Sequence, residues 1–89
     1  MQKACQIRVY GKVQGVGFRY FTQNKANETG VKGFVKNMPD NSVYIEAEGD
    51  ESSIAIFAQW CRRGPILARV THFEIHPVPV SGFQSFETR

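Results

Sequence analysis

Apolar and polar residues alternate in the first half of the chain, which is typical of half-buried β-strands. The alternating stretches are Ala4–Tyr10, Val31–Asn37 and Val43–Glu48. The last two are separated by the short polar segment Met38–Ser42, in which proline, aspartate and asparagine supply the residues that turns favour. We therefore predict a first strand, followed later by a β-hairpin.

Two segments have the pattern of helices. Phe18–Thr29 contains no glycine or proline and is followed by Gly30, a residue that commonly ends a helix. A second helix is expected after Gly49, with Asp50 as its N-cap and Gly64-Pro65 at its end. Its apolar stripe has the spacing i, i+3, i+4, i+7 and consists of Ile54, Phe57, Ala58 and Cys61. Such a stripe is expected to face a sheet.

The end of the chain predicts a fourth strand over Arg69–His76, broken by Pro77 and Pro79, and a short last strand over Phe83–Thr88. The resulting order is β-α-β-β-α-β with a short strand appended. This order favours an α+β, ferredoxin-like sandwich, in which two helices cover one face of an antiparallel sheet. The fold hosts unrelated functions, so it does not by itself indicate an activity.

Length and composition narrow the class of protein. With 89 residues, 42% of them hydrophobic, the chain is expected to form one domain, 1–89, with a single core. No run is long enough to span a membrane and the N-terminus lacks a signal peptide, so we expect a cytoplasmic protein. Because the chain is small and has no long exposed apolar stripe, we expect a monomer. The net charge of +3 is compatible with an anionic small molecule or a nucleic acid. Cys5 and Cys61 are expected to be buried thiols, with a disulfide between them as the alternative.

A glycine-rich turn joins the first strand to the first helix. Gly11, Gly15 and Gly17 fall within seven positions, and backbone N–H groups at such a turn lack partners within the chain. Concave sets of these groups at the start of a helix bind anions, above all phosphate. Arg19 lies in the first helical turn, where a cation is unfavourable unless an anion lies between it and the loop. Its planar guanidinium matches phosphate oxygens. The alternative is a tight turn beside a solvated arginine.

Other familiar motifs fail on this sequence. No Lys-Ser/Thr pair completes a Walker A motif, and Tyr20 stands where a dinucleotide fingerprint needs its third glycine. Lys32–Val35 resembles the start of an RNA-binding motif, but the aromatic residues that should follow are missing and the stretch lies in the wrong strand. His72 and His76 read as an exposed pair rather than a metal site. We therefore expect no nucleic-acid partner and no bound metal.

Asn37 is the remaining candidate for chemistry beside the loop. It ends a strand that should neighbour the first one. We expect it to be the only uncharged polar side chain that this neighbouring strand brings beside the loop. A neutral amide cannot act as a general base, but it can orient a water molecule. The alternative role is that of a turn residue before Met38-Pro39.

Taken together, these residues closely resemble the acylphosphatase family. The family's signature is matched by the run from Gly11 to Arg19, and its second motif by Gly33–Asn37 with Pro39-Asp40 and Ser42-Val43. Gly64-Pro65, Ala68–Val70 and Phe86 match its usual C-terminal part. Asn41 stands where glycine is usual, and asparagine tolerates the positive φ that this turn position needs.

The resemblance implies hydrolysis of the carboxyl–phosphate bond of acyl phosphates, without metal or cofactor, with inorganic phosphate as product and inhibitor. The family's phosphate-binding arginine falls on Arg19 and its water-positioning asparagine on Asn37. The phosphate cradle falls on the backbone amides of Gln14, Gly15, Val16, Gly17, Phe18 and Arg19. Because the carboxylate leaves readily, such a site needs positioning and charge stabilisation more than a strong nucleophile. The alternative is a non-catalytic phosphate-binding module on the same fold.

Overall fold

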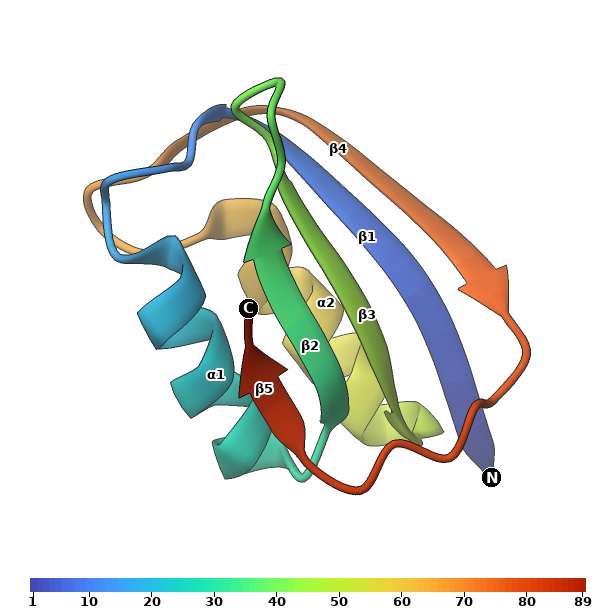
Figure 1. Cartoon of the computed structure of the whole chain (residues 1–89). Coiled ribbons are helices and arrows are strands. Elements are labelled where there is room, and N and C mark those ends of the chain that lie inside the picture. Colours follow the sequence, from blue (N-terminus) through green and yellow to red (C-terminus); the bar gives the residue numbers. More distant parts are fainter.

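The computed structural model describes all 89 residues, and its elements follow the order that the sequence predicts (Figure 1). They are β1 (Gln2–Lys12), α1 (Phe18–Thr29), β2 (Lys32–Asn37), β3 (Val43–Asp50), α2 (Glu51–Arg63), β4 (Arg69–Val78) and β5 (Phe86–Thr88). The predicted bounds of α1 are confirmed, and Gly30 ends the helix with a φ of 77°. Asn41 has a φ of 73°, as its position in the hairpin turn requires.

One five-stranded sheet has the order β4-β1-β3-β2-β5, and both helices cover the same face of it (Figure 1). The four long strands pair antiparallel, which confirms the ferredoxin-like sandwich. The short strand β5 pairs parallel with β2, so the complete sheet is mixed. Our expectation that the strand carrying Asn37 neighbours the first strand is wrong. The crossover through α1 leaves a gap between β1 and β2, and β3 fills it by pairing with both.

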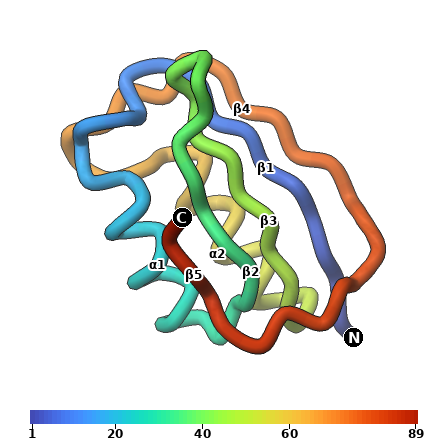
Figure 2. Tube along the Cα trace, viewed as in Figure 1, coloured from blue at the N-terminus to red at the C-terminus, as the bar shows by residue number.

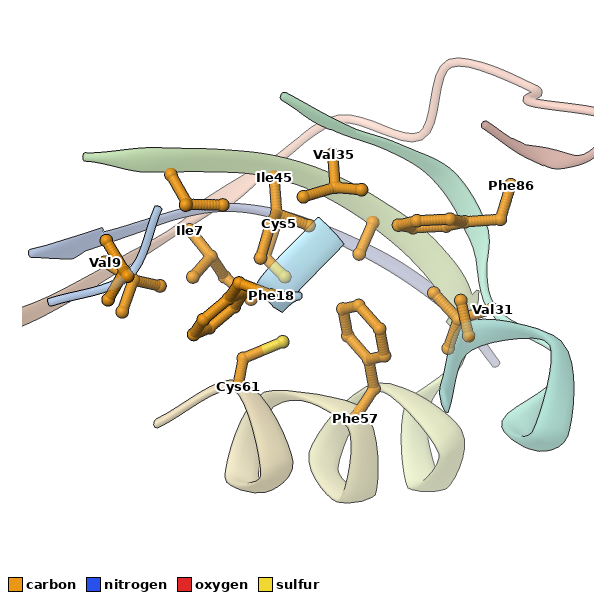
Figure 3. Packing of buried hydrophobic residues seen from close by; sticks show 14 of the residues in the cluster. Cys5, Ile7, Val9, Phe18, Val31, Val35, Ile45, Phe57, Cys61 and Phe86 are labelled. Atoms are coloured by element: carbon orange, nitrogen blue, oxygen red, sulfur yellow. The ribbon is translucent and has the colours of Figure 1, made fainter. Parts of the chain in front are cut away.

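The core lies between the sheet and the two helices (Figure 3). Alternate residues of β1 point into it, and α2 contributes Ile54, Phe57 and Cys61, all buried. Phe57 packs edge-on against Phe86 of β5, with ring centroids 5.8 Å apart. This contact ties the last strand to the core. Cys5 and Cys61 are both free and buried, and Figure 3 shows them in the packing between β1 and α2.

The C-terminal part of the chain departs from the prediction. Pro77 lies within β4 rather than ending it, because β4 is an edge strand whose outer side needs no N–H donor. The last strand begins at Phe86, and the segment before it, residues 79–85, is irregular. Figure 2 follows this segment from β4, past the ends of β1 and β3, to β5. We call residues 79–85 the strap.

The strap is fastened to the sheet by one buried carboxylate. Glu48 of β3 is only 4% exposed, although alternation predicts that it faces outward. Its side chain accepts hydrogen bonds from the backbone N–H groups of Ser81, Gly82 and Phe83. These three bonds compensate the carboxylate for its loss of water.

Neither helix is both long and apolar enough to cross a membrane.

Candidate active site

The turn between β1 and α1 has the backbone conformation that its glycines suggest. Gly15 has a φ of 75° and Gly17 a φ of 78°, a left-handed region that residues with a Cβ atom seldom adopt. A Cβ atom on Gly15 would meet nothing within 4 Å, so this position is open toward solvent. A Cβ atom on Gly17 would approach the Phe21 ring to 3.2 Å. Both glycines therefore serve the path of the backbone.

The two helices begin in different ways. At α2, Asp50 caps the first turn by accepting a hydrogen bond from the Ser52 N–H, and Glu51 adds a negative charge. At α1, the N-cap is Gly17, no side chain caps the turn and no acidic residue lies in it. The first backbone hydrogen bond of α1 runs from Phe21 N–H to the Gly17 carbonyl, at 3.0 Å. The N–H groups before it are therefore available to an anion.

Apolar side chains anchor this loop from below. Val13, Val16 and Phe18 are each at most 6% exposed and belong to the core. The Phe18 ring lies under Gly64, where an added Cβ atom would come within 2.7 Å of it. The backbone amides of the loop are thus held in place by the packing of these apolar side chains in the core. The Val16 side chain points into the core, so it contributes to the site only through its backbone.

Gln14 fastens the loop to the hairpin turn. Its Nε2 donates to the carbonyl oxygens of Met38 and Ser42, each at 2.9 Å. The turn is itself held by Asp40, which accepts hydrogen bonds from the hydroxyl and the N–H of Ser42. These bonds lower the pKa of the Asp40 carboxyl. The Gln14 Nε2 group therefore has a structural role, and the donor that Gln14 can offer an anion is its backbone N–H.

Arg19 is the second residue of α1 and lines the cleft described below. Its Nη1 donates to the backbone carbonyl oxygen of Arg89 at 2.9 Å. No aspartate or glutamate forms an ion pair with it. The guanidinium is planar, and this single bond to the residue that follows β5 leaves its other donors free. This leaves Arg19 able to bind an anion with two prongs.

Asn37 reaches the same cleft, although β3 separates its strand from β1. The crossover makes β1 and β2 run in the same direction, so the C-terminal end of β2 lies at the same end of the sheet as the glycine loop. Asn37 is the last residue of β2, it is exposed, and its side chain makes no hydrogen bond within the protein. It is followed by the turn that Gln14 holds.

A single cleft of about 440 Å³ brings these residues together. It is lined by Val13, Gln14, Gly15, Gly17, Phe18, Arg19, Tyr20, Gln23, Asn37 and Thr88. All the predicted site residues except Val16 line it. Asn37 is not the only uncharged polar side chain brought there from beyond the loop, since Gln23 and Thr88 line the cleft too. Gln23 had a detectable signal, because it follows Arg19 by four residues on the same helical face. Thr88 had no such signal in the sequence, because its position in the cleft depends on the path of the strap.

Comparison with known proteins places the chain in a family. The profile of the family described as Acylphosphatase matches residues 5–88. An acylphosphatase from Thermotoga petrophila is 49% identical over 94% of this chain and 93% of its own. The crystal structure of an acylphosphatase from Bacillus subtilis superposes with a TM-score of 0.94 at 36% identity, covering 100% of this chain and 99% of that one.

A longer protein contains a related part. The crystal structure of full-length HypF in its phosphate- and nucleotide-bound form matches with a TM-score of 0.90 and 33% identity, over 100% of this chain but only 12% of HypF. The profile match, together with relatives that are matched over nearly their whole length, identifies the family. The chain belongs to the acylphosphatase family.

Proposed function

We propose that this protein hydrolyses acyl phosphates to a carboxylate and inorganic phosphate. The observation that carries the proposal is the uncapped N-terminus of α1, which faces the same cleft as Arg19 and Asn37. Curated members of the family to which the chain belongs bear the name acylphosphatase. The acyl phosphate is a small-molecule substrate, and no nucleic acid, membrane or second domain is needed to complete the site.

The phosphoryl group is held by the loop and Arg19. Backbone N–H groups from Gln14 to Arg19 surround its oxygens, and the left-handed glycines let the backbone approach closely. Arg19 binds two phosphate oxygens with the donors that the Arg89 carbonyl leaves free. These donors are already in position before the substrate binds, so they stabilise charge on the phosphoryl oxygens without reorganising.

Asn37 orients the attacking water. Its side chain is exposed in the cleft and free of bonds within the protein, so its amide can accept from water and donate to phosphate. The water oxygen bonds to phosphorus while the bond to the carboxylate oxygen breaks, and that electron pair leaves on the carboxylate. A phosphate oxygen of the substrate accepts the water's proton. Because the carboxylate is a good leaving group, the reaction needs neither a metal ion nor a cofactor. In this proposal the protein works in the cytoplasm as a monomer.

Turnover of benzoyl phosphate in excess chelator tests this function. We expect hydrolysis that persists in the chelator and is inhibited competitively by inorganic phosphate. Arg19→Lys is the matched control, because it keeps the charge but loses the planar fork. Phosphate binding without turnover would overturn the proposal in favour of a non-catalytic phosphate-binding module. Turnover that disappears in chelator would overturn metal independence alone.

A further inference from the structure

Gln23 and Thr88 form a second polar part of the cleft, beyond the loop, Arg19 and Asn37. Gln23 follows Arg19 by four residues, just over one turn of α1 and about 6 Å along the helix axis. Thr88 pairs with Val35, two residues before Asn37 on β2. Gln23 on α1 therefore lies farther from the glycine loop than Arg19, and Thr88 beside β2 lies farther from it than Asn37. A phosphate held by the loop and Arg19 leaves this end of the cleft to the rest of the substrate.

A hydrogen bond fixes the orientation of the Gln23 amide. The Thr88 hydroxyl donates to Gln23 Oε1, which leaves the two protons of Nε2 without a partner in the protein. Gln23 is half-buried and Thr88 is exposed, so this hydrogen bond lies on the open side of the cleft, where a substrate can reach the amide. An anionic substrate also favours this orientation, because the reverse one would present the amide oxygen to negative charge. The cleft therefore contains a fixed neutral donor beside the phosphate site.

We propose that Gln23 Nε2 donates a hydrogen bond to the acyl carbonyl oxygen of the substrate and stabilises the departing carboxylate. This inference rests on the proposed function. As the bond between phosphorus and the bridging oxygen breaks, its electron pair spreads over both oxygens of the carboxylate. The carbonyl oxygen thus becomes more negative, and a fixed donor binds it more strongly in the transition state than in the ground state. Gln23 is the catalytic residue of this step, and Thr88 positions it.

The contact between Arg19 and Arg89 makes it possible to test the role of Gln23 separately from phosphate binding. The backbone oxygen of Arg89 accepts the bond from Arg19 Nη1, so the guanidinium contacts the residue that follows β5 rather than the Gln23 side chain. Replacing Gln23 should therefore leave phosphate affinity nearly unchanged. A residue that merely positioned Arg19 would weaken phosphate binding and slow all substrates alike.

A series of acyl phosphates with different leaving groups tests the inference. Acetyl phosphate and benzoyl phosphates with electron-withdrawing ring substituents are assayed with the wild-type protein and with Gln23→Leu, which keeps the size of the side chain. We expect kcat/KM to fall on the order of 10-fold or more for acetyl phosphate, the size of one hydrogen bond to a charged oxygen. The loss should shrink as the leaving acid becomes stronger, while inhibition by inorganic phosphate changes less than about 2-fold.

Thr88 supplies the matched pair of variants. Thr88→Val removes the hydroxyl and should reproduce part of the leaving-group dependence of Gln23→Leu, whereas Thr88→Ser should restore wild-type behaviour. An equal loss for every leaving group, or a parallel loss of phosphate inhibition, would overturn the role of Gln23. The proposed function fails separately, because a wild-type protein that turns over none of the acyl phosphates would disprove it before any variant is compared.

Discussion

The Gln14 side chain donates a hydrogen bond to the Met38 carbonyl at 2.9 Å, and so joins the glycine loop to the residue that follows Asn37. The same Nε2 donates to the Ser42 carbonyl at the other end of the hairpin turn. One amide therefore sets the position of the proposed phosphate cradle relative to the proposed water-binding residue. Gln14 belongs to the site through this connection and not through a side-chain contact with substrate.

Gln14→Leu should lower both stability and turnover. Each carbonyl keeps one backbone partner, because Met38 also accepts from Asn41 N–H and Ser42 from Met38 N–H. The loss is therefore that of two ordinary hydrogen bonds, about 1–3 kcal/mol in the free energy of unfolding. Turnover should fall as the loop and Asn37 lose their fixed relation. Denaturant unfolding and kcat measure the two effects, and an unchanged kcat beside a clear loss of stability would disprove the positional role.

Arg19→Lys should lose most activity and most inhibition by inorganic phosphate, on the order of 10²-fold or more in kcat/KM. The lysine ammonium cannot bind the Arg89 carbonyl and two phosphate oxygens in one plane, as the guanidinium does. Inhibition and turnover assays at constant ionic strength measure both losses. Lys12→Ala provides a control for net charge, because Lys12 precedes the loop and does not line the cleft. Near-normal turnover of Arg19→Lys would show that a point charge suffices.

Asn37→Ala should lower kcat by on the order of 10²-fold while phosphate inhibition changes little. A residue that orients the attacking water contacts the transition state more than the bound ground state. Asn37→Asp keeps the shape but brings a carboxylate to the incoming phosphate, so it should weaken inhibition as well. Both variants should fold normally, since Asn37 is exposed and makes no internal hydrogen bond. Loss of phosphate binding with retained kcat in Asn37→Ala would instead make Asn37 a substrate anchor.

The sequence predicts the helices and the long strands because their signals are local. Gly30 ends α1 and Asp50 caps α2 through interactions within a few residues. The alternation that places Cys5, Ile7 and Val9 in the core needs only the period of a strand. Phe34 and Glu48 are buried for a different reason. Both face away from the helices. The strap covers Glu48, and Phe34 is covered by Phe83 of the strap together with Tyr44 and Arg89.

The site residues likewise differ in whether their signal in the sequence is local or long-range. The loop and Arg19 are recognisable because they are contiguous in the sequence, and their order in the chain sets their relation in space. Asn37 is recognised by the family motif, yet the strand order that brings it to the cleft differs from the one expected. Thr88 comes from the other end of the chain, and its place follows from the parallel pairing of β5 with β2. No periodicity in the sequence encodes such a long-range pairing.

The two cysteines should resist alkylation in the folded protein. Burial raises the pKa of the Cys5 thiol to about 11 and that of Cys61 well above its ordinary value. At pH 8, a pKa of 11 leaves on the order of 0.1% of the thiol as the reactive thiolate. Iodoacetamide should therefore label neither residue in native protein and both after unfolding in guanidinium, as read by intact mass. Labelling of one site in native protein would reveal local opening between β1 and α2.

Glu48→Gln should destabilise the chain and loosen its C-terminal part. The carboxylate is buried and accepts three backbone N–H groups of the strap. Glutamine offers one oxygen and places an NH₂ group against the remaining donors, so about 2–3 kcal/mol of unfolding free energy should be lost. Since the strap leads into β5, which carries Thr88 and is followed by Arg89, turnover should fall as well. Denaturant unfolding and amide exchange at Ser81, Gly82 and Phe83 measure the effect.

Glu46→Gln is the control, because Glu46 lies on the same strand and bonds only to the Tyr44 hydroxyl. Equal stability and equal exchange in the two variants would show that the strap is held by its apolar contacts, such as Phe83 against Phe34, rather than by the carboxylate.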